Sequence, residues 1–577
     1  MISSVTTTQD HFALMEQLCP FKPARGPKQV FPAFDSSHRN FVDEGMQIEF
    51  NHAIQTRDGA DLAADIYLPI GLSEGSKLPV VLAITPYGKQ NAFDASKIPP
   101  SRNFDPGFDG VVFSKYTPFE ASDPAFWTKQ GFAYVIVDAR GSYASGGARL
   151  TFVSKLDGLD AYDIIEYLGT RPWTNGHVGM IGSSALGAIQ WQAASLRPPH
   201  LAAIMVQDGY TDLYRELAYK GGVPHKNFME LLTTSYMAHG NNERSPVIDL
   251  GEACERYPFF NEFWEMHSSD TKSITCAVYV ISSLADNGIH TPGSIRGYLT
   301  VRSGLKFLEL HQYRKWEWQL TAESLERQAA FFNHVLIGPD RHSAGSVNFW
   351  PPVRLHIAEK HYAGSWRREK EFPIARTIRT RYYLGLENQL SKASSMMENA
   401  SVTYDAKTRS VFWKTRFNSP TEITGTSRLH ITLSISSGSD ADIFVTLQKL
   451  DRDGNTVHFP YHTFINDGHV AWGWLRASKR KLDEHPVGDE VAHTFLEEDV
   501  QPLQPGQKIE VDIGIQPSAT LFRAGEALKL VVQGRDFGNY DPASEIPRAG
   551  SGCNEGQHKI FLEGSYLELP VIPPMFR

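Results

Sequence analysis

The hydrophobic positions in the first 350 residues fall into short apolar runs, which alternate with longer segments of helical spacing. Short runs rich in β-branched residues are typical of strands that are buried on both faces. Strands that alternate with helices indicate a mostly parallel sheet with helices on both of its faces. The expected strands are 78–85, 132–138, 177–182, 201–206, 276–283 and 305–310, and a helix is expected over 324–336.

The pattern changes after about residue 350, where apolar and polar residues alternate with period 2. Gly, Pro, Asp and Asn separate the alternating segments, and helical periodicity is nearly absent. This pattern is typical of an all-β sandwich or jelly roll. The expected strands are 428–436, 442–450, 508–515 and 527–534.

Two insertions interrupt the first region. Residues 215–270 are predicted to be helices with many aromatic side chains, and residues 90–125 are rich in Pro, Phe and Asp. Such excursions from a rigid sheet commonly form lids or pocket walls. We therefore expect an arm over 1–44, an α/β core over 45–214 and 271–350, a helical cap over 215–270 and a jelly-roll domain over 351–577.

The stretch GMIGSSALG, residues 179–187, holds two adjacent serines between a predicted strand and a predicted helix. A sharp turn at this junction needs small neighbours and raises its central side chain above the sheet edge. Ser184 has Gly182 two positions before it, whereas Ser183 has the bulky Ile181 there. We therefore favour Ser184 as a nucleophile, and the alternative is that these small residues only form the turn.

A serine nucleophile needs a base within hydrogen-bond reach and an acid that orients the base. On an α/β-hydrolase sheet these residues follow in the order Ser, Asp or Glu, His, each after a strand. Asp286 follows the strand 276–283, and His311 follows the next strand, far enough along for one helix between them. The order and spacing predict Asp286 as the acid and His311 as the base.

Other residues in this region are open alternatives. His290 lies four positions after Asp286 and is expected to line the pocket or cap a helix. His342 follows a predicted helix instead of a strand, while Asp208 and Asp212 follow an earlier strand and could replace the acid.

The turn at Ser184 also offers donors for a developing oxyanion. The helix that follows the serine directs backbone N–H groups at it, so we expect the Ala185 amide to be one donor. Tyr87, in the segment PYGK after the strand 78–85, is expected at the same sheet edge, where its hydroxyl could supply the second. The alternative for Tyr87 is an ordinary aromatic residue packed beside Pro86.

Charge and cysteine content narrow the function classes. The 577 residues carry a formal net charge of −9 and no long basic cluster, so no nucleic-acid partner is expected. Four cysteines without C-x-x-C spacing, the first of them Cys19, fit a reducing compartment. No secretory signal and no membrane-spanning apolar run is visible, so we expect a cytoplasmic protein without a membrane partner.

From about residue 45 onward the chain resembles the cocaine esterase and X-prolyl dipeptidyl-peptidase-like hydrolases. The resemblance rests on the turn around Ser184, the PYGK segment, the run 137–147, the histidine segment 308–316 and the C-terminal segment 502–537. It implies an α/β-hydrolase core, a helical cap and a jelly roll with the acyl site between them. It also implies no metal and no organic cofactor.

The chain departs from the family pattern at two positions. The family usually has a tyrosine directly after the nucleophile and an aromatic residue before the aspartate, where this chain has Ala185 and Ala285. The backbone N–H that an oxyanion hole needs survives the first change, but the bulk and hydroxyl of the tyrosine do not. Both changes are expected to enlarge or loosen the site, and the loss of the tyrosine leaves its pocket shape and substrate preference open.

These observations predict a serine hydrolase that cleaves a carboxylic ester or amide of a small hydrophobic molecule through an acyl-enzyme. Phe260 and Trp264 of the cap, together with His290, are expected to bind the substrate. One alternative is an acyltransferase or cyclising enzyme that uses the same triad. Another is a non-catalytic binding protein on the same fold, and a homodimer is left open.

Overall fold

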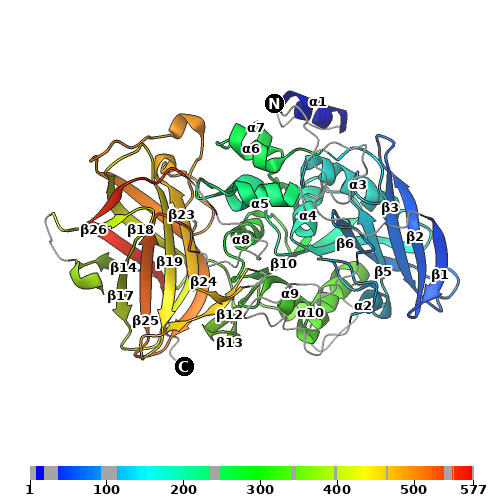
Figure 1. The fold of residues 1–577 in the computed structure, drawn as a ribbon. Coiled ribbons are helices and arrows are strands. Elements are labelled where there is room, and N and C mark those ends of the chain that lie inside the picture. Colours follow the sequence, from blue (N-terminus) through cyan, green and yellow to red (C-terminus); the bar gives the residue numbers. More distant parts are fainter. Residues whose placement is uncertain are drawn as a thin grey trace.

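The computed structural model describes residues 8–18, 37–91, 113–149, 151–233, 247–338, 346–394, 399–462, 465–537, 549 and 552–574. Cys19, His342 and most of the predicted insertion 90–125 lie outside the described residues. An α/β body and a β-sandwich lie side by side, with a group of short helices above the boundary between them (Figure 1).

The α/β body is built on one mixed sheet in which parallel strands form the centre. The spatial order is β1–β2–β3–β5–β4–β6–β7–β10–β11–β12–β13, and the pairs from β5 to β12 are parallel. β4 and β5 are buried along their whole length, as the continuous apolar runs predicted. The bounds are β1 Arg39–Asp43, β2 Met46–Gln55, β3 Asp61–Pro69, β4 Leu78–Thr85, β5 Ala133–Asp138, β6 Thr174–Ser183, β7 Leu201–Gln207, β10 Ala277–Ser283, β11 Lys306–His311, β12 Val353–Lys360 and β13 Ala363–Glu369.

Helices cover both faces of this sheet. α3 (Lys155–Gly169) and α4 (Ala185–Ser195) pack together on one side, while α2 (Pro124–Lys129) and α10 (Ala322–Phe332) lie on the other (Figure 1). α8 (Thr291–Thr300) connects β10 to β11, and α9 (Lys315–Gln319) follows β11. The arrangement confirms the α/β fold that the alternating pattern predicted.

Short elements form the cap between β7 and β10. They are the π-helical turn η3 (Tyr214–Ala218), β8 (Tyr219–Lys220), β9 (Val223–Pro224), α5 (Lys226–Leu231), α6 (Leu250–Arg256), α7 (Glu262–Glu265) and η5 (Thr271–Ser273). Aromatic rings fill the inside of the cap: the ring centroid of Tyr214 lies 4.4 Å from that of Tyr219 and 5.6 Å from that of Trp264.

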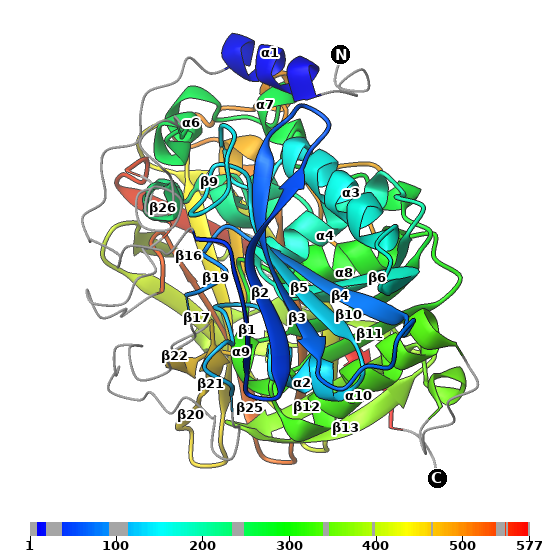
Figure 2. The same ribbon diagram turned by 90° about the vertical axis from the view of Figure 1, so that its right-hand side faces the viewer.

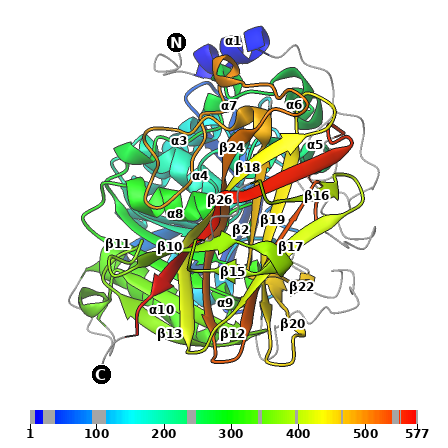
Figure 3. The same cartoon turned by 90° about the vertical axis from the view of Figure 1, so that its left-hand side faces the viewer.

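The C-terminal domain is a β-sandwich whose two sheets face each other across an apolar core (Figure 3). One sheet contains β14 (Ile378–Leu384), β16 (Ser401–Asp405), β26 (Gln557–Ile572), β18 (Thr421–Ile435) and β24 (Ile509–Phe522). The other contains β17 (Ser410–Arg416), β25 (Ala527–Gln533), β19 (Asp442–Leu450) and β23 (Ala471–Arg476). Shorter elements are η6 Asn333–Ile337, η7 Val347–Phe349, η8 Leu386–Asn388, β15 Leu390–Ser391, β20 Thr456–Val457, β21 Phe459–Tyr461, β22 Ile465–Gly468, η9 Ala477–Lys479 and η10 Glu497–Asp499.

At both ends, the α/β body extends beyond the predicted domain boundaries at residues 45 and 350. Residues 1–44, expected to be an arm, contain the helix α1 (Thr8–Leu18) and β1, which pairs with β2 at the sheet edge (Figure 2). β12 extends the parallel sheet beyond residue 350, and a single bridge between Ala358 and Thr520 links it to β24. Among the described residues, no helix has the length and apolar character that a membrane crossing requires.

Candidate active site

Ser184 occupies a strained turn between β6 and α4. Its backbone has φ 60° and ψ −118°, a conformation that a non-glycine residue adopts only when its surroundings hold it there. Small residues make the turn possible: a Cβ on Gly187 would lie 3.0 Å from the Gly209 Cα, and a Cβ on Gly182 would lie 2.6 Å from the Leu186 Cβ. The predicted strand-to-helix turn is therefore present, with Ser184 as its central residue.

The histidine beside Ser184 is His290. Its Nε2 lies 3.0 Å from the Ser184 Oγ, and its Nδ1 hydrogen-bonds to the Oδ2 of Asp286. His290 stands at the N-cap position of α8, so the chain turns back directly after Asp286, and the His290 amide lies 3.4 Å from the Asp286 carbonyl. A turn of this kind brings side chains four positions apart onto one side.

The predicted pairing of Ser184 with His311 is corrected by this geometry. His311 is the last residue of β11, lies opposite Ser283 in the register and is fully buried. Its ring lies among the rings of Tyr313 and Trp318, and burial lowers the pKa of its imidazole to about 3. The usual chain order places one strand between the acid and the base, but here the turn before α8 already places a histidine against Asp286.

The other acidic alternatives have different partners. The Oδ1 of Asp208 accepts hydrogen bonds from the Ser282 hydroxyl at 3.0 Å and the Ser283 amide at 2.7 Å. Asp212 forms an ion pair with Arg215 at 2.6 Å. Among the three aspartates considered, Asp286 is thus the one whose carboxylate contacts His290.

The electrostatics of the Asp286–His290 pair favour an ionised acid and a neutral base. Burial lowers the pKa of His290 below its ordinary value of 6.5, and the neighbouring Asp286 offsets this only in part. Burial would by itself raise the pKa of Asp286, but the contact with His290 outweighs it and the pKa lies below its usual range. A neutral imidazole held by a carboxylate can accept a proton from Ser184.

Two candidate oxyanion donors lie near the turn. In the described part of the chain the Ala185 amide has no hydrogen-bond acceptor, whereas the Ser184 amide is engaged by the carbonyls of Gln207 and Asp208 at 3.0 and 3.1 Å. Tyr87 follows β4, which runs parallel to β6, so it stands at the sheet edge where the turn lies. Its ring packs against Phe119 with 5.3 Å between centroids.

A buried ion pair that the sequence analysis missed flanks the turn. The Lys315 ammonium contacts the Glu120 carboxylate, and both side chains are buried. The Glu120 carbonyl accepts a hydrogen bond from the Ser183 amide at 2.9 Å. This contact ties the loop before α2 to β6, the strand that ends at the Ser184 turn.

The two aromatic residues expected to bind substrate pack inside the cap. Trp264 has no exposed surface, and its indole N–H donates to the Tyr257 carbonyl at 2.8 Å, which corrects its expected role as a binding residue. Phe260 is partly buried, and the Arg215 guanidinium lies 4.2 Å from its ring centroid. Aromatic character in a lid segment could not by itself distinguish packing from an exposed binding surface.

The β-sandwich contacts the loop that carries Asp286 and His290. The His462 amide donates to the Ala285 carbonyl at 2.7 Å. The Trp472 amide donates to the Asn287 Oδ1 at 3.3 Å, and the Gly288 amide donates to the Gln516 Oε1 at 2.6 Å. The loop is thus held by three hydrogen bonds from the C-terminal domain.

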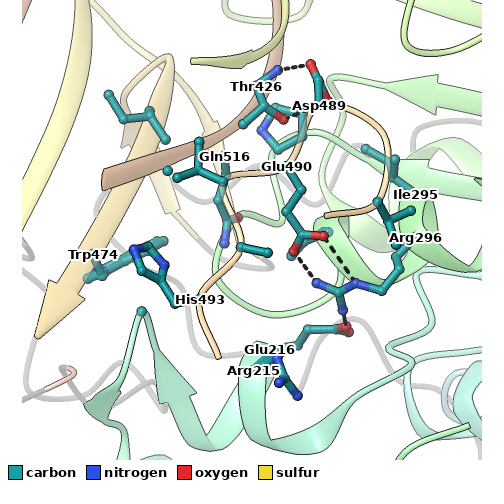
Figure 4. A pocket seen from close by; sticks show the side chains of 18 of the residues that line it. Arg215, Glu216, Ile295, Arg296, Thr426, Trp474, Asp489, Glu490, His493 and Gln516 are labelled. Atoms are coloured by element: carbon teal, nitrogen blue, oxygen red, sulfur yellow. Dashed lines mark hydrogen bonds and ion pairs between the residues drawn. The ribbon is translucent and has the colours of Figure 1, made fainter. Parts of the chain in front are cut away.

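A separate pocket lies at the junction of cap, core and sandwich (Figure 4). Arg296 of α8 crosses its wall and forms ion pairs with Glu216 of the cap and Glu490 of the sandwich. Gln516 and Trp474 also line this pocket, but Ser184 and His290 do not. The pocket therefore lies next to the loop of Asp286 and His290, because its lining residue Gln516 bonds to Gly288, but it does not contain the Ser184–His290 pair.

Family models match both parts of the chain. The X-Pro dipeptidyl-peptidase (S15 family) model matches residues 58–314. The X-Pro dipeptidyl-peptidase C-terminal non-catalytic domain model matches residues 348–565.

Solved structures and a curated relative agree with these matches. The crystal structure of a CocE/NonD family hydrolase from Staphylococcus aureus is 30% identical, has a TM-score of 0.86, and the alignment covers 96% of this chain and 100% of that chain. An aminopeptidase from a marine sediment archaeon, Thaumarchaeota archaeon, is 16% identical with a TM-score of 0.70 over 96% and 99% of the two chains, and shares the fold. Cocaine esterase from a Rhodococcus strain is 32% identical over 181 residues, which is 31% of this chain and 27% of the relative.

The sheet order, the turn at Ser184 and these matches define an α/β-hydrolase of the serine hydrolase class with a C-terminal all-β domain. The chain belongs to the CocE/NonD family of X-Pro dipeptidyl-peptidase-like hydrolases. The family resemblance and the fold class expected from the sequence are both confirmed.

Proposed function

We propose that this protein hydrolyses a carboxylic ester or amide of a small molecule through an acyl-enzyme on Ser184, with His290 as the base and Asp286 as the orienting acid. The observation that carries the proposal is the continuous hydrogen-bonded series from the Ser184 Oγ through the His290 ring to Asp286. Such a series activates an otherwise weak nucleophile.

In the first step the Ser184 Oγ attacks the carbonyl carbon while His290 Nε2 takes the hydroxyl proton. Asp286 keeps the ring proton on Nδ1, so that Nε2 is free to accept. The Ala185 amide and the Tyr87 hydroxyl donate to the oxyanion of the tetrahedral intermediate. His290 then returns its proton to the departing alcohol or amine, and the acyl group stays on Ser184.

Water releases the acyl group in the second half of the reaction. His290 removes a proton from the water as it attacks the acyl carbonyl, and then gives that proton back to the Ser184 oxygen. An acyl group taken by another alcohol or amine would make the same machinery a transferase. The water reaction is favoured because the matched family and its CocE/NonD relative are named for hydrolysis.

Labelling with a fluorophosphonate probe tests the nucleophile without knowledge of the substrate. The wild type is expected to gain one covalent adduct, located on Ser184 by peptide mass spectrometry. Ser184→Ala should not react, whereas Ser183→Ala, which removes the neighbouring buried hydroxyl, should react like the wild type. An adduct that persists in Ser184→Ala would overturn the proposal.

Substrate class is tested with matched pairs of activated acyl esters and acyl anilides. Product analysis with and without an added alcohol or amine separates hydrolysis from acyl transfer. Hydrolysis is supported if free acid is released at the same rate with and without the added alcohol or amine. It is contradicted if most of the acyl group is transferred to the added acceptor. A chain that labels at Ser184 but turns over neither ester nor amide would also contradict the proposed activity.

A further inference from the structure

Two histidines and a glutamate converge at the edge of the core sheet, away from the Ser184 turn. The Nε2 of His38 lies 2.9 Å from the Oε1 of Glu49, and the Nδ1 of His52 lies 2.7 Å from the same oxygen. The three candidate ligand atoms lie within 4.8 Å of one another. Two imidazole nitrogens therefore face one carboxylate oxygen.

A β-bulge creates this convergence. Side chains three positions apart on a regular strand point to opposite faces, which would separate Glu49 from His52. The pairing of β2 with β3 shifts register between these two residues, and Asn51 between them has a φ of 57°. The extra residue re-aims His52 onto the face that carries Glu49.

Asn51, the bulge residue, also positions the segment that contains His38. The Asn51 side-chain amide donates to the Ser37 carbonyl at 2.9 Å. In the β1–β2 pair Asn40 lies opposite Glu49, so alternation along the chain places His38 on the Glu49 side. Figure 2 shows β1 and β2 side by side, with α3 to the right of their upper part.

An outer contact orients the inner histidine. The Nε2 of His52 lies 2.6 Å from the hydroxyl of Tyr167 on α3, which leaves Nδ1 directed at Glu49. Metal-binding histidines usually hold their second ring nitrogen in such a hydrogen bond. The side chains of His38, Glu49 and His52 are 55%, 30% and 27% exposed, which leaves a path for an ion and for water ligands.

We propose that His38, Glu49 and His52 form a binding site for a divalent transition-metal ion, of which Zn²⁺ is the expected occupant. Two neutral imidazoles and one carboxylate are a donor set that zinc accepts, and water completes the coordination. Imidazole ligands disfavour Mg²⁺ and Ca²⁺, which prefer oxygen donors. The ion would fasten the segment before β1 to β2 and takes no part in the chemistry at Ser184.

Zinc titration of the metal-free full-length protein, followed by calorimetry and by elemental analysis after dialysis, tests the site. The wild type is expected to retain one equivalent of Zn²⁺ that His52→Ala and the nearly isosteric Glu49→Gln do not retain. His200→Ala is the matched control, because His200 forms a similarly exposed pair with Glu166 at 2.8 Å. That variant should bind like the wild type.

Two outcomes of the titration would overturn the site, and a sulfur ligand in X-ray absorption would be a third. One is the absence of saturable zinc binding by the wild type, and the other is unchanged stoichiometry in both His52→Ala and Glu49→Gln. Tyr167→Phe should keep the ion but weaken binding about 10-fold, as expected for loss of an outer contact. X-ray absorption should show nitrogen or oxygen ligands at about 2.0–2.1 Å, and sulfur at about 2.3 Å would assign the ion to a cysteine instead.

Discussion

The imidazole of His290 lies 3.0 Å from the Ser184 hydroxyl, although 106 positions separate the two residues in the chain. The Asp286 carboxylate, which hydrogen-bonds to this imidazole, is only four positions away. The proposed base and acid therefore belong to one short loop, while the proposed nucleophile belongs to another. The relative placement of these two loops determines whether the hydroxyl can be activated.

His290→Ala is expected to lower kcat about as much as Ser184→Ala, by about 10⁴-fold or more, because the two groups act as one unit and their losses do not add. His311→Gln is the control. Because His311 is fully buried beside aromatic rings, its replacement should lower the melting temperature while kcat of the folded protein stays within about tenfold. Steady-state kinetics with an activated ester, with melting curves for each variant, check both expectations. A large kcat loss confined to the His311 variant would return the role of base to that residue.

Tyr87→Phe is expected to lower kcat by about 10²–10³-fold and to change KM little. The substitution removes one hydroxyl donor and keeps the ring that packs against Phe119. An oxyanion donor acts mainly in the transition state, so its loss appears in kcat. Measurement of both constants on an activated ester tests this role. An effect limited to KM would mean that Tyr87 contacts bound substrate and that the second donor lies elsewhere.

The pH profile of kcat/KM should show its acid limb below pH 6.5. Protonated His290 cannot accept the Ser184 proton, so activity falls as pH drops through the pKa of this histidine. Burial lowers that pKa below its ordinary value of 6.5, which extends activity toward lower pH. Rates measured from about pH 5 to 9 in constant ionic strength locate the limb. Half-maximal activity above about pH 7 would show that the folded protein raises the pKa instead.

Gln516→Ala is expected to lower kcat about tenfold or more, since small displacements of a catalytic group cost large factors in rate. The variant removes the acceptor of the Gly288 amide, so the loop of Asp286 and His290 loses one of its anchors. A looser loop admits water, so the acid limb of the pH profile should move up toward the ordinary histidine value. Gln533→Ala is the matched control, because that buried side chain donates to Arg535 within the same domain. Equal kinetics and pH profiles for both variants would exclude a positioning role for Gln516.

The sequence predicts the frame of this protein better than its contacts. Buried parallel strands give continuous apolar runs, and β4, β5 and β7 fall where those runs lie. The turn at Ser184 was also recognisable, because its backbone requires small neighbours at fixed positions. These features depend on residues that are close together in the chain.

The histidine that contacts Ser184 is harder to predict, because two histidines follow Asp286 and the usual spacing favours the later one. The useful signal was the four-residue interval from Asp286 to His290 immediately before the Thr291–Pro292 start of α8, which places both side chains on one turn. Trp264 illustrates the other limit: whether an aromatic cap residue is buried depends on partners such as Tyr214 and Tyr257, whose proximity no local pattern encodes.

Three hydrogen bonds join the sandwich to residues 285–288. The C-terminal domain therefore helps to position a loop that belongs to the N-terminal α/β domain. A fragment that ends near residue 350 would keep Ser184, Asp286 and His290. It would lose the three hydrogen bonds that hold the loop of Asp286 and His290. Such a fragment is expected to lack activity even where it folds. For the same reason, a chimaera that takes its C-terminal domain from a relative would keep Ser184, Asp286 and His290 but change the contacts that position the last two.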